Sequence, residues 1–192
     1  MIIGITGLNA SGKDVAGEYL MSKGFAHFSC SDVIRDFCRK EGLELIRENL
    51  INKGNELREA NGNGYLAEVL LGKIRKEKIE LATVSSIRHP DEVGELKKAQ
   101  DFYLLKIETP IEVRYSRVKK RGNERDGVSF EEFQKSEEKE RTGSGAGQQL
   151  DKVMEMADYT IINDGSIQKL YENINKLLIY AKEKNSHKKE TE

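Results

Sequence analysis

The sequence has almost no net charge, few cysteines and no long apolar run. Its 32 lysines and arginines nearly balance 33 aspartates and glutamates, so the basic excess typical of nucleic-acid-binding proteins is missing. No apolar run approaches the ~20 residues that span a bilayer, and the opening MIIGITG carries no basic leader or cleavage site. Cys30 and Cys38 are too few for a disulfide framework and are not spaced like zinc ligands. We therefore expect a cytoplasmic protein with reduced, packed cysteines and without nucleic-acid or membrane partners.

Short apolar stretches alternate with helical patterns along the chain. Runs rich in β-branched residues predict strands at 1–6, 25–29, 79–87, 101–108 and 158–163. Amphipathic spacing, with Pro90 and Pro110 suited to first turns, predicts helices at 12–24, 32–42, 44–60, 65–78, 90–99, 110–121, 129–141 and 166–184. Ser31 or Asp32 is expected to cap the second of these helices. At 192 residues the chain is expected to form one domain over 1–184, followed by a flexible tail at 185–192.

This order of elements predicts an α/β fold. Parallel strands need crossover helices, so five strands alternating with helices indicate a parallel sheet covered on both faces, in three layers α/β/α. A helical insertion at about 31–78 and a charged lid at about 118–146 interrupt the alternation. Ligands of such sheets bind beyond the carboxyl ends of the strands. The motifs described next lie at those ends or in the lid.

Residues 7–14, GLNASGKD, fit the pattern of a phosphate-binding loop (P-loop), in which Gly, four residues and Gly-Lys lie between a strand and a helix. Glycines let backbone N–H groups curl around a phosphate, the helix N-terminus adds partial positive charge, and the lysine adds a full one. An ordinary glycine-rich turn is the alternative, but the flanking strand and helix favour phosphate binding. The residues expected to bind a nucleotide are Gly7, Asn9, Ala10, Ser11, Gly12 and Lys13. Lys13 is also expected to act in catalysis.

Asp14 stands where such loops normally carry the Ser or Thr ligand of a magnesium ion. As an acid in the first turn of a helix it also suits the helix dipole, whatever its function. As a hard oxygen ligand, direct or through water, it can hold the Mg²⁺ that accompanies a nucleoside triphosphate. An anion this close to a triphosphate repels it unless a cation lies between them. The metal role is therefore favoured.

Charged side chains after the second and third strands suggest a phosphate-acceptor site. Asp32 and Arg35 lie one helical turn apart and are predicted to face the same way, while Arg88 directly follows the third strand. Guanidinium groups bind phosphate oxygens bidentately. We expect Asp32, Arg35 and Arg88 to bind the acceptor, with Asp32 and Arg88 also acting in catalysis. For Asp32 and Arg35, a helix cap with a surface ion pair is the alternative.

Four further arginines lie in the lid or just before it. Arg117, Arg121 and Arg125 recur at intervals of four, and Arg141 precedes the glycine-rich TGSGAG. Such charges usually form a solvated surface, but arginines on a mobile segment can close over a transferring phosphoryl group and stabilise its charge. We expect Arg117 to contact the nucleotide, Arg121 and Arg125 to act on the transferring group, and Arg141 to bind substrate.

Taken together, GLNASGKD, SDVIR, the IR after the third strand, the arginine-rich lid and ADYTIINDGSIQKL resemble the P-loop nucleoside monophosphate kinase superfamily. The last stretch is similar to dephospho-coenzyme A kinases; SDVIRD, LIRENLINKGNELRE and SIRHPDEV are similar to the P-loop domain attached to some deoxycytidylate deaminases. The resemblance implies that Asn163 and Gly165 lie near the adenine. It also reveals a departure, because relatives usually carry an Asp at the end of the third strand where this chain has Ser85 or Ser86.

These features predict an ATP- and Mg²⁺-dependent phosphotransferase acting on a nucleoside monophosphate, a deoxynucleoside monophosphate or a dephospho-coenzyme A-like acceptor. Asp32 is needed as a base only where the acceptor is a hydroxyl. A nucleotide-binding sensor without turnover is the alternative, and the missing third-strand acid is its best support. The sequence does not determine the oligomeric state, and a homo-oligomer is one of the alternatives that it leaves open.

Overall fold

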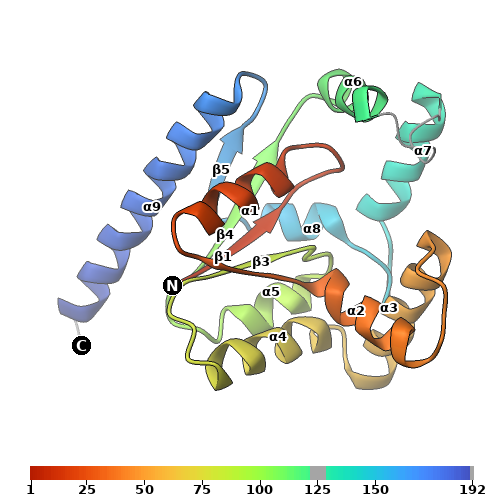
Figure 1. Cartoon of the computed structure of the whole chain (residues 1–192), viewed down its shortest axis with the longest axis horizontal. Coiled ribbons are helices and arrows are strands. Elements are labelled where there is room, and N and C mark those ends of the chain that lie inside the picture. Colours follow the sequence, from red (N-terminus) through yellow and green to blue (C-terminus); the bar gives the residue numbers. More distant parts are fainter. Residues whose placement is uncertain (122–128, 191–192) are drawn as a thin grey trace.

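The computed structural model describes residues 1–121 and 129–190, and these form the predicted three layers, helix, sheet and helix (Figure 1). The strands of the described part are β1 Ile2–Thr6, β2 Ala26–Ser29, β3 Ala82–Ser85, β4 Phe102–Glu108 and β5 Tyr159–Ile162. They pair in the order β2-β3-β1-β4-β5, and every pair is parallel. The predicted fold class is confirmed.

Each face of the sheet has its own apolar core, because neighbouring side chains on a strand point to opposite faces. On β4, Leu104 packs into one core and Leu105 into the other, and both are fully buried. The helices α4 Tyr65–Lys76, α5 Pro90–Leu96 and α8 Leu150–Glu155 cover the Leu104 side. The helices α1 Lys13–Ser22 and α9 Ile167–Glu190 cover the Leu105 side (Figure 1).

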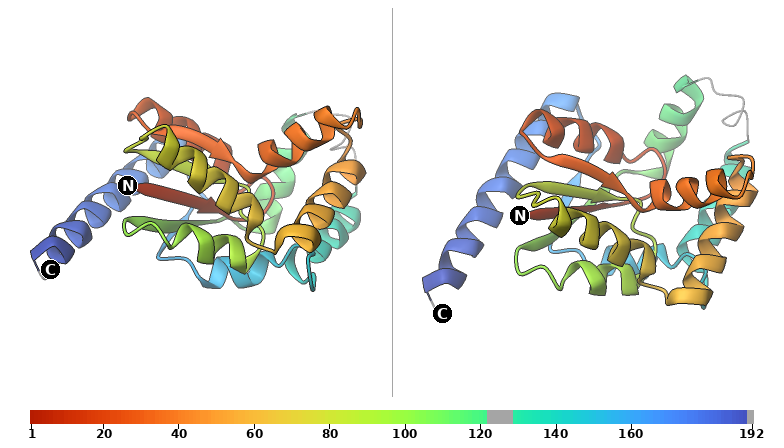
Figure 2. Two further views of the ribbon diagram at one scale, coloured as in Figure 1. Left: turned by 90° about the horizontal axis from the view of Figure 1, so that it is seen from below. Right: turned by 60° about the horizontal axis from the view of Figure 1, so that its bottom comes forward.

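Further helices gather beyond the carboxyl ends of the strands. These are α2 Cys30–Lys40, α3 Arg47–Asn61, α6 Ile111–Arg121 and α7 Phe130–Arg141. Figure 2 shows α2, α3 and α7 together at this end of the molecule, so the expected acceptor insertion and the expected lid meet there. Helices therefore surround the edge of the sheet at which parallel sheets bind ligands.

Several element boundaries differ from the predictions. The cap of α2 is Ser29, whose hydroxyl accepts from the N–H of Ser31 at 3.3 Å, so the prediction of Ser31 or Asp32 as cap was wrong. The helix starts directly where β2 ends, which leaves no loop between them. The short helix α8 was missed because six residues are too few to show a helical period. The predicted tail is helical as far as Glu190.

Both cysteines are free and buried, as predicted. Burial raises the pKa of the Cys30 thiol well above its ordinary value, so this side chain stays protonated. Among residues 1–121 and 129–190, no helix combines the length and the apolar character that crossing a membrane requires.

Candidate functional site

The P-loop connects β1 to α1 at the centre of the sheet. Gly12 caps α1 with a left-handed backbone, φ 104°, and has no side chain to occupy the helix N-terminus. The loop is tightened by the N–H of Ser11, which donates to Leu8 O at 3.2 Å. A helix N-terminus without a side-chain cap presents N–H groups to an anion.

Two P-loop glycines have no room for a side chain. A Cβ on Gly7, φ 143°, would come within 3.0 Å of Ile107 O on β4. A Cβ on Gly12 would come equally close to the amide nitrogen of Asn163, which follows β5. The glycine spacing recognised in the sequence is thus required by close approach of neighbouring strands as well as by backbone conformation.

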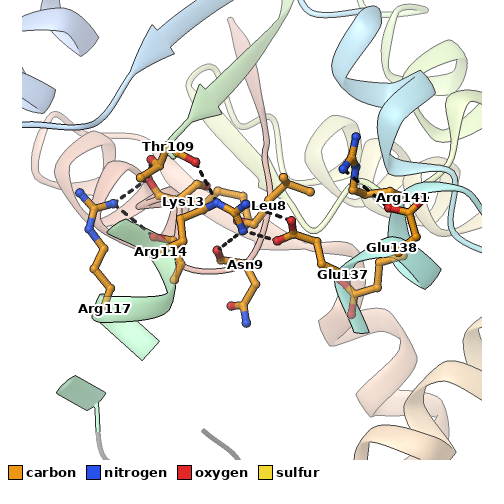
Figure 3. A network of polar contacts seen from close by, with 12 residues as sticks. Leu8, Asn9, Lys13, Thr109, Arg114, Arg117, Glu137, Glu138 and Arg141 are labelled. Atoms are coloured by element: carbon orange, nitrogen blue, oxygen red, sulfur yellow. Dashed lines mark hydrogen bonds and ion pairs between the residues drawn. The ribbon is translucent and has the colours of Figure 1, made fainter. Parts of the chain in front are cut away.

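Three side chains contact the backbone carbonyls of the P-loop, namely those of Asn163, Thr109 and Arg117. The Asn163 amide donates to Ser11 O at 2.7 Å, and the Thr109 hydroxyl lies 3.1 Å from the same carbonyl. Arg117 of α6 donates to Ala10 O at 3.2 Å and to Asn163 O at 3.1 Å (Figure 3). Asn163 and Arg117 therefore shape the P-loop by contacting its backbone, while the nucleotide contact predicted for Arg117 and the adenine site predicted for Asn163 and Gly165 stay predictions. Gly165 is exposed.

Lys13 lies folded over the P-loop, with its Nζ donating to Leu8 O at 2.7 Å. The pKa of Lys13 is lowered to about 8, chiefly by burial and then by the nearby Arg88 cation, while Asp14 and Glu140 act in the opposite direction. The Lys13 ammonium is therefore partly desolvated and has a second cation nearby. An oxyanion bound beside Lys13 would favour its charged form.

A cavity of about 700 Å³ joins the P-loop to the helical insertion and the lid. Its lining includes half of the predicted site residues, namely Gly7, Asn9, Ala10, Gly12, Lys13, Asp14, Arg35 and Arg88. Thr6, at the end of β1, also lines it and has a buried hydroxyl that finds no hydrogen-bond partner among the described residues. A bound ligand or its water would satisfy that hydroxyl.

Two predicted substrate-binding residues lie elsewhere. Asp32 pairs with Arg35 at 2.6 Å and keeps 60% of its side chain exposed, and Arg141 pairs with Asp151 of α8 at 2.9 Å. Neither is among the described residues that line the cavity. Arg121 ends α6, and its backbone alone is described. Arg125 lies outside the described residues.

The lid lies against the P-loop through a buried pair that the sequence did not reveal. Arg114 of α6 and Glu137 of α7 form an ion pair, and the Arg114 Nε donates to Thr109 O at 2.8 Å. Figure 3 shows the Arg114 guanidinium between the P-loop and Glu137. Val118 and Phe133 add an apolar contact over Ala10. The spacing of Arg114 and Arg117 puts both on one face of α6 and could have marked Arg114 as a neighbour of the site, but nothing in the sequence pointed to Glu137.

A second contact of the lid reaches Arg88, on the side of the cavity where an acceptor was expected. Arg88 donates to Glu140 of α7 at 3.0 Å and to Gln148 at 2.6 Å. Arg47 of α3 binds the other oxygen of the Glu140 carboxylate and donates to Ser136 at 3.1 Å. Arg47 and Glu140 were also missed, because both lie in charged helical stretches where no single charge stands out.

His89 and Glu92 fix the backbone that carries Arg88. The His89 side chain accepts from the N–H of Asp91 at 3.2 Å and caps α5. The buried Glu92 carboxylate accepts from the N–H of Arg88 at 2.7 Å and is itself paired with Arg58. The backbone at Arg88 is therefore held in place by a buried side chain.

The third strand carries no acid at its end. β3 ends at Ser85, whose hydroxyl lies 3.3 Å from the His27 ring, and Ser86 follows with φ 58° and lines the cavity. Within residues 1–121 and 129–190, no group of three or more His, Cys, Asp or Glu side chains is placed to hold a metal ion.

Asp14 is exposed and lines the cavity beside Lys13. Mg²⁺ usually takes one or two carboxylates, with substrate phosphates and water as its other ligands, so Asp14 fits that requirement.

Comparison with known proteins agrees with this geometry. The family described as an AAA domain matches residues 3–143. A UPF0200 protein of Thermococcus gammatolerans is 35% identical over 185 residues, which cover 93% of this chain and 94% of that protein. A UPF0200/UPF0201 protein of Archaeoglobus fulgidus is 37% identical over 182 residues, or 93% of this chain, and the chain spans 55% of that longer relative.

Among solved structures, shikimate kinase from Acinetobacter baumannii in complex with shikimate matches over 93% of both chains with a TM-score of 0.57 and 19% identity. At that identity the match establishes the fold, which is that of a P-loop kinase. The chain accordingly has a P-loop kinase-like fold and belongs to the UPF0200 family and to the family described as an AAA domain.

Proposed function

We propose that the protein is an ATP-dependent phosphotransferase that moves the γ-phosphate to a small phosphorylated acceptor. Nucleoside monophosphates, deoxynucleoside monophosphates and dephospho-coenzyme A-like molecules are the acceptor classes that the sequence resemblance favours. The observation that carries the proposal is one cavity lined by the P-loop at one side and by Arg35 and Arg88 at the other. Such a cavity can hold a donor and an acceptor with their reacting groups adjacent.

In this mechanism the P-loop N–H groups and Lys13 bind the β- and γ-phosphates of the donor. Arg88, held by Glu92, binds the acceptor and places its oxygen toward the P-loop. The lid helix α7, docked through Arg114 and Glu137, keeps water out of the cavity. Asp14 is the candidate residue that would hold Mg²⁺, and the ion, when bound, would supply positive charge that offsets the charge of the donor phosphates.

The placement of Asp32 bears on the choice of acceptor. A base is needed to deprotonate a hydroxyl acceptor but not the oxyanion of a monophosphate. Asp32 is exposed, paired with Arg35 and outside the lining of the cavity. This supports a monophosphate acceptor over a hydroxyl acceptor.

A nucleotide sensor without turnover is the second candidate, and two observations favour it. The end of β3 carries Ser85 and Ser86 in place of an acid. In addition, lid carboxylates already engage Arg47, Arg88 and Arg114. A protein that uses its own carboxylates at these positions would bind a nucleotide yet leave no place for an acceptor.

A coupled ADP-release screen separates the two functions. The purified protein is given Mg-ATP and, one at a time, nucleoside and deoxynucleoside monophosphates and dephospho-coenzyme A. ADP release that depends on one acceptor, and that is lost in Lys13→Met, supports the phosphotransferase. Binding of ATP without ADP release above the Lys13→Met background for every acceptor supports the sensor.

A further inference from the structure

Two guanidinium groups from distant parts of the chain converge on the carboxylate of Glu140. Arg47 comes from α3 in the insertion, and Arg88 follows β3. Arg88 Nη1 lies 3.0 Å from Oε2 of Glu140, and Arg47 binds Oε1, so each oxygen has its own guanidinium. Charge-assisted hydrogen bonds of this kind, from guanidinium groups to carboxylate or phosphate oxygens, are also the ones with which proteins bind anionic ligands.

The charge of this cluster exceeds what one carboxylate can neutralise. Glu140 supplies one negative charge to two positive ones, and only 19% of its side chain is exposed. The donors also reach neutral acceptors, since Arg47 contacts Ser136 and Arg88 contacts Gln148. A phosphate monoester, with close to two negative charges and three terminal oxygens at neutral pH, matches two guanidinium groups better than a carboxylate does.

Glu140 also lies on the donor side of this cluster. Its charge acts on Lys13 of the P-loop, as does the charge of Arg88. Arg47, Glu140, Ser136 and Gln148 line both the main cavity and a second cavity of about 530 Å³. The carboxylate therefore occupies the boundary between the two cavities, at a place from which an oxyanion could face the P-loop.

We propose that Glu140 is an internal competitor for the acceptor's phosphate, which binds to Arg47 and Arg88 in its place. The inference rests on the proposed function in one respect, namely that the phosphate belongs to the phosphoryl acceptor. Arg47 then becomes a substrate-binding residue. The lid shields the two guanidinium groups until an acceptor displaces its carboxylate, and the apparent affinity for the acceptor is reduced by the fraction of molecules in which Glu140 occupies the site.

Isothermal titration of the full chain with inorganic phosphate tests this competition. Glu140→Gln removes the competing charge and keeps the side-chain shape, so phosphate should bind at least about threefold more tightly. Glu138→Gln is the matched control, because Glu138 lies on the same helix, is 62% exposed and, within the described part of the chain, forms an ion pair with Arg141 alone, at 3.7 Å. Glu138→Gln should leave phosphate affinity unchanged.

The double variant Arg47→Met/Glu140→Gln separates this site from the P-loop, which also binds phosphate. The gain in phosphate affinity expected of Glu140→Gln must vanish in this double variant, because phosphate binding in the P-loop does not depend on Arg47. An affinity in Glu140→Gln equal to wild type, an equal gain in Glu138→Gln, or a gain that survives in the double variant would overturn the proposal.

The same variants are then titrated with a non-hydrolysable ATP analogue and Mg²⁺. Failure of the analogue to bind would count against the proposed function while leaving the phosphate result standing. Normal binding of the analogue together with an unchanged phosphate affinity in Glu140→Gln would refute the competition by Glu140 and leave the proposed function intact.

Discussion

Arg58 and Glu92 form an ion pair in the interior of the protein, with 3% and 0% of their side chains exposed. Arg58 donates to Oε1 of Glu92 through Nε at 3.1 Å and through Nη2 at 2.8 Å. The other oxygen of Glu92 accepts from the N–H groups of Arg88 and His89. A buried pair between α3 and α5 thus determines where the segment after β3, and with it Arg88, begins.

Removing Arg58 should therefore cost far more than removing an exposed arginine. Arg58→Met leaves a buried carboxylate without its partner, and we expect the free energy of unfolding to fall by about 3–5 kcal/mol. Urea denaturation followed by circular dichroism measures this change. The control is Arg39→Met, whose partner Asp36 lies at 2.7 Å on the surface of α2. That substitution should cost about 0–1 kcal/mol, and equal losses in the two variants would contradict the structural role of the buried pair.

The glycines of the P-loop should not tolerate alanine. Gly12→Ala places a Cβ in a left-handed backbone and against Asn163, so we expect a loss of about 1–3 kcal/mol in the free energy of unfolding and weaker binding of an ATP analogue. Gly72→Ala is the control, since its Cβ meets nothing within 4 Å in α4. It should raise the free energy of unfolding by about 0.4–1 kcal/mol and leave nucleotide binding unchanged. Wild-type nucleotide affinity in Gly12→Ala would show that the close approach is not essential.

The sequence predicted the P-loop because every requirement of that motif is local. A buried strand, a glycine-rich turn and a helix follow each other within residues 1–24, so no distant contact is needed to identify them. Arg88 was predicted for a similar reason, since the carboxyl ends of parallel strands share one edge of the sheet. Residues of the P-loop and Arg88 both line the main cavity.

The lid contacts could not be predicted in this way. Successive residues of a helix point about 100° apart, so Arg141 faces Asp151 while its neighbour Glu140 faces Arg47 and Arg88. The sequence shows both as members of one charged stretch. Only the angle at which α7 lies across α3 decides which of them reaches the cavity, and that angle depends on packing between segments nearly a hundred residues apart.

Nucleotide binding should weaken as the pH rises through about 8. The pKa of Lys13 in the folded protein is lowered to about 8, so above that pH the empty site loses the charge that attracts a triphosphate. We expect the affinity for an ATP analogue to fall between pH 7 and pH 9 in the wild type. Lys13→Met should bind more weakly at every pH and lack this decline. A wild-type affinity that is independent of pH in this range would contradict the lowered pKa.

The same group should make the folded protein more stable at higher pH. Between pH about 8 and 10.5 the unfolded chain keeps a proton on Lys13 that the folded chain has lost, so the free energy of unfolding rises with pH through this window. Comparing wild type with Lys13→Met isolates this contribution, because other groups titrate alike in both. A difference between the two proteins that stays constant from pH 7 to pH 10.5 would refute the assignment.

The last prediction concerns the metal side of the P-loop. If Asp14 holds Mg²⁺, Asp14→Ala should reduce the gain in affinity for an ATP analogue that Mg²⁺ provides over EDTA. Glu18→Ala, one turn further along α1 and exposed, is the matched control and should keep the full gain. Ser86 is the position for a compensating acid, because it lines the cavity while the Ser85 hydroxyl lies against His27 and the Phe28 carbonyl.

Ser86→Asp is therefore expected to restore part of the Mg²⁺-dependent gain to Asp14→Ala. Its backbone, φ 58°, is one that Asp tolerates better than most residues, so the substitution should not disturb the turn after β3. Titration of the analogue with and without Mg²⁺, across the single and double variants, measures the effect without requiring turnover. A full Mg²⁺-dependent gain in Asp14→Ala would mean that the metal is held by phosphates and water alone, and that the acid in the P-loop serves the helix dipole.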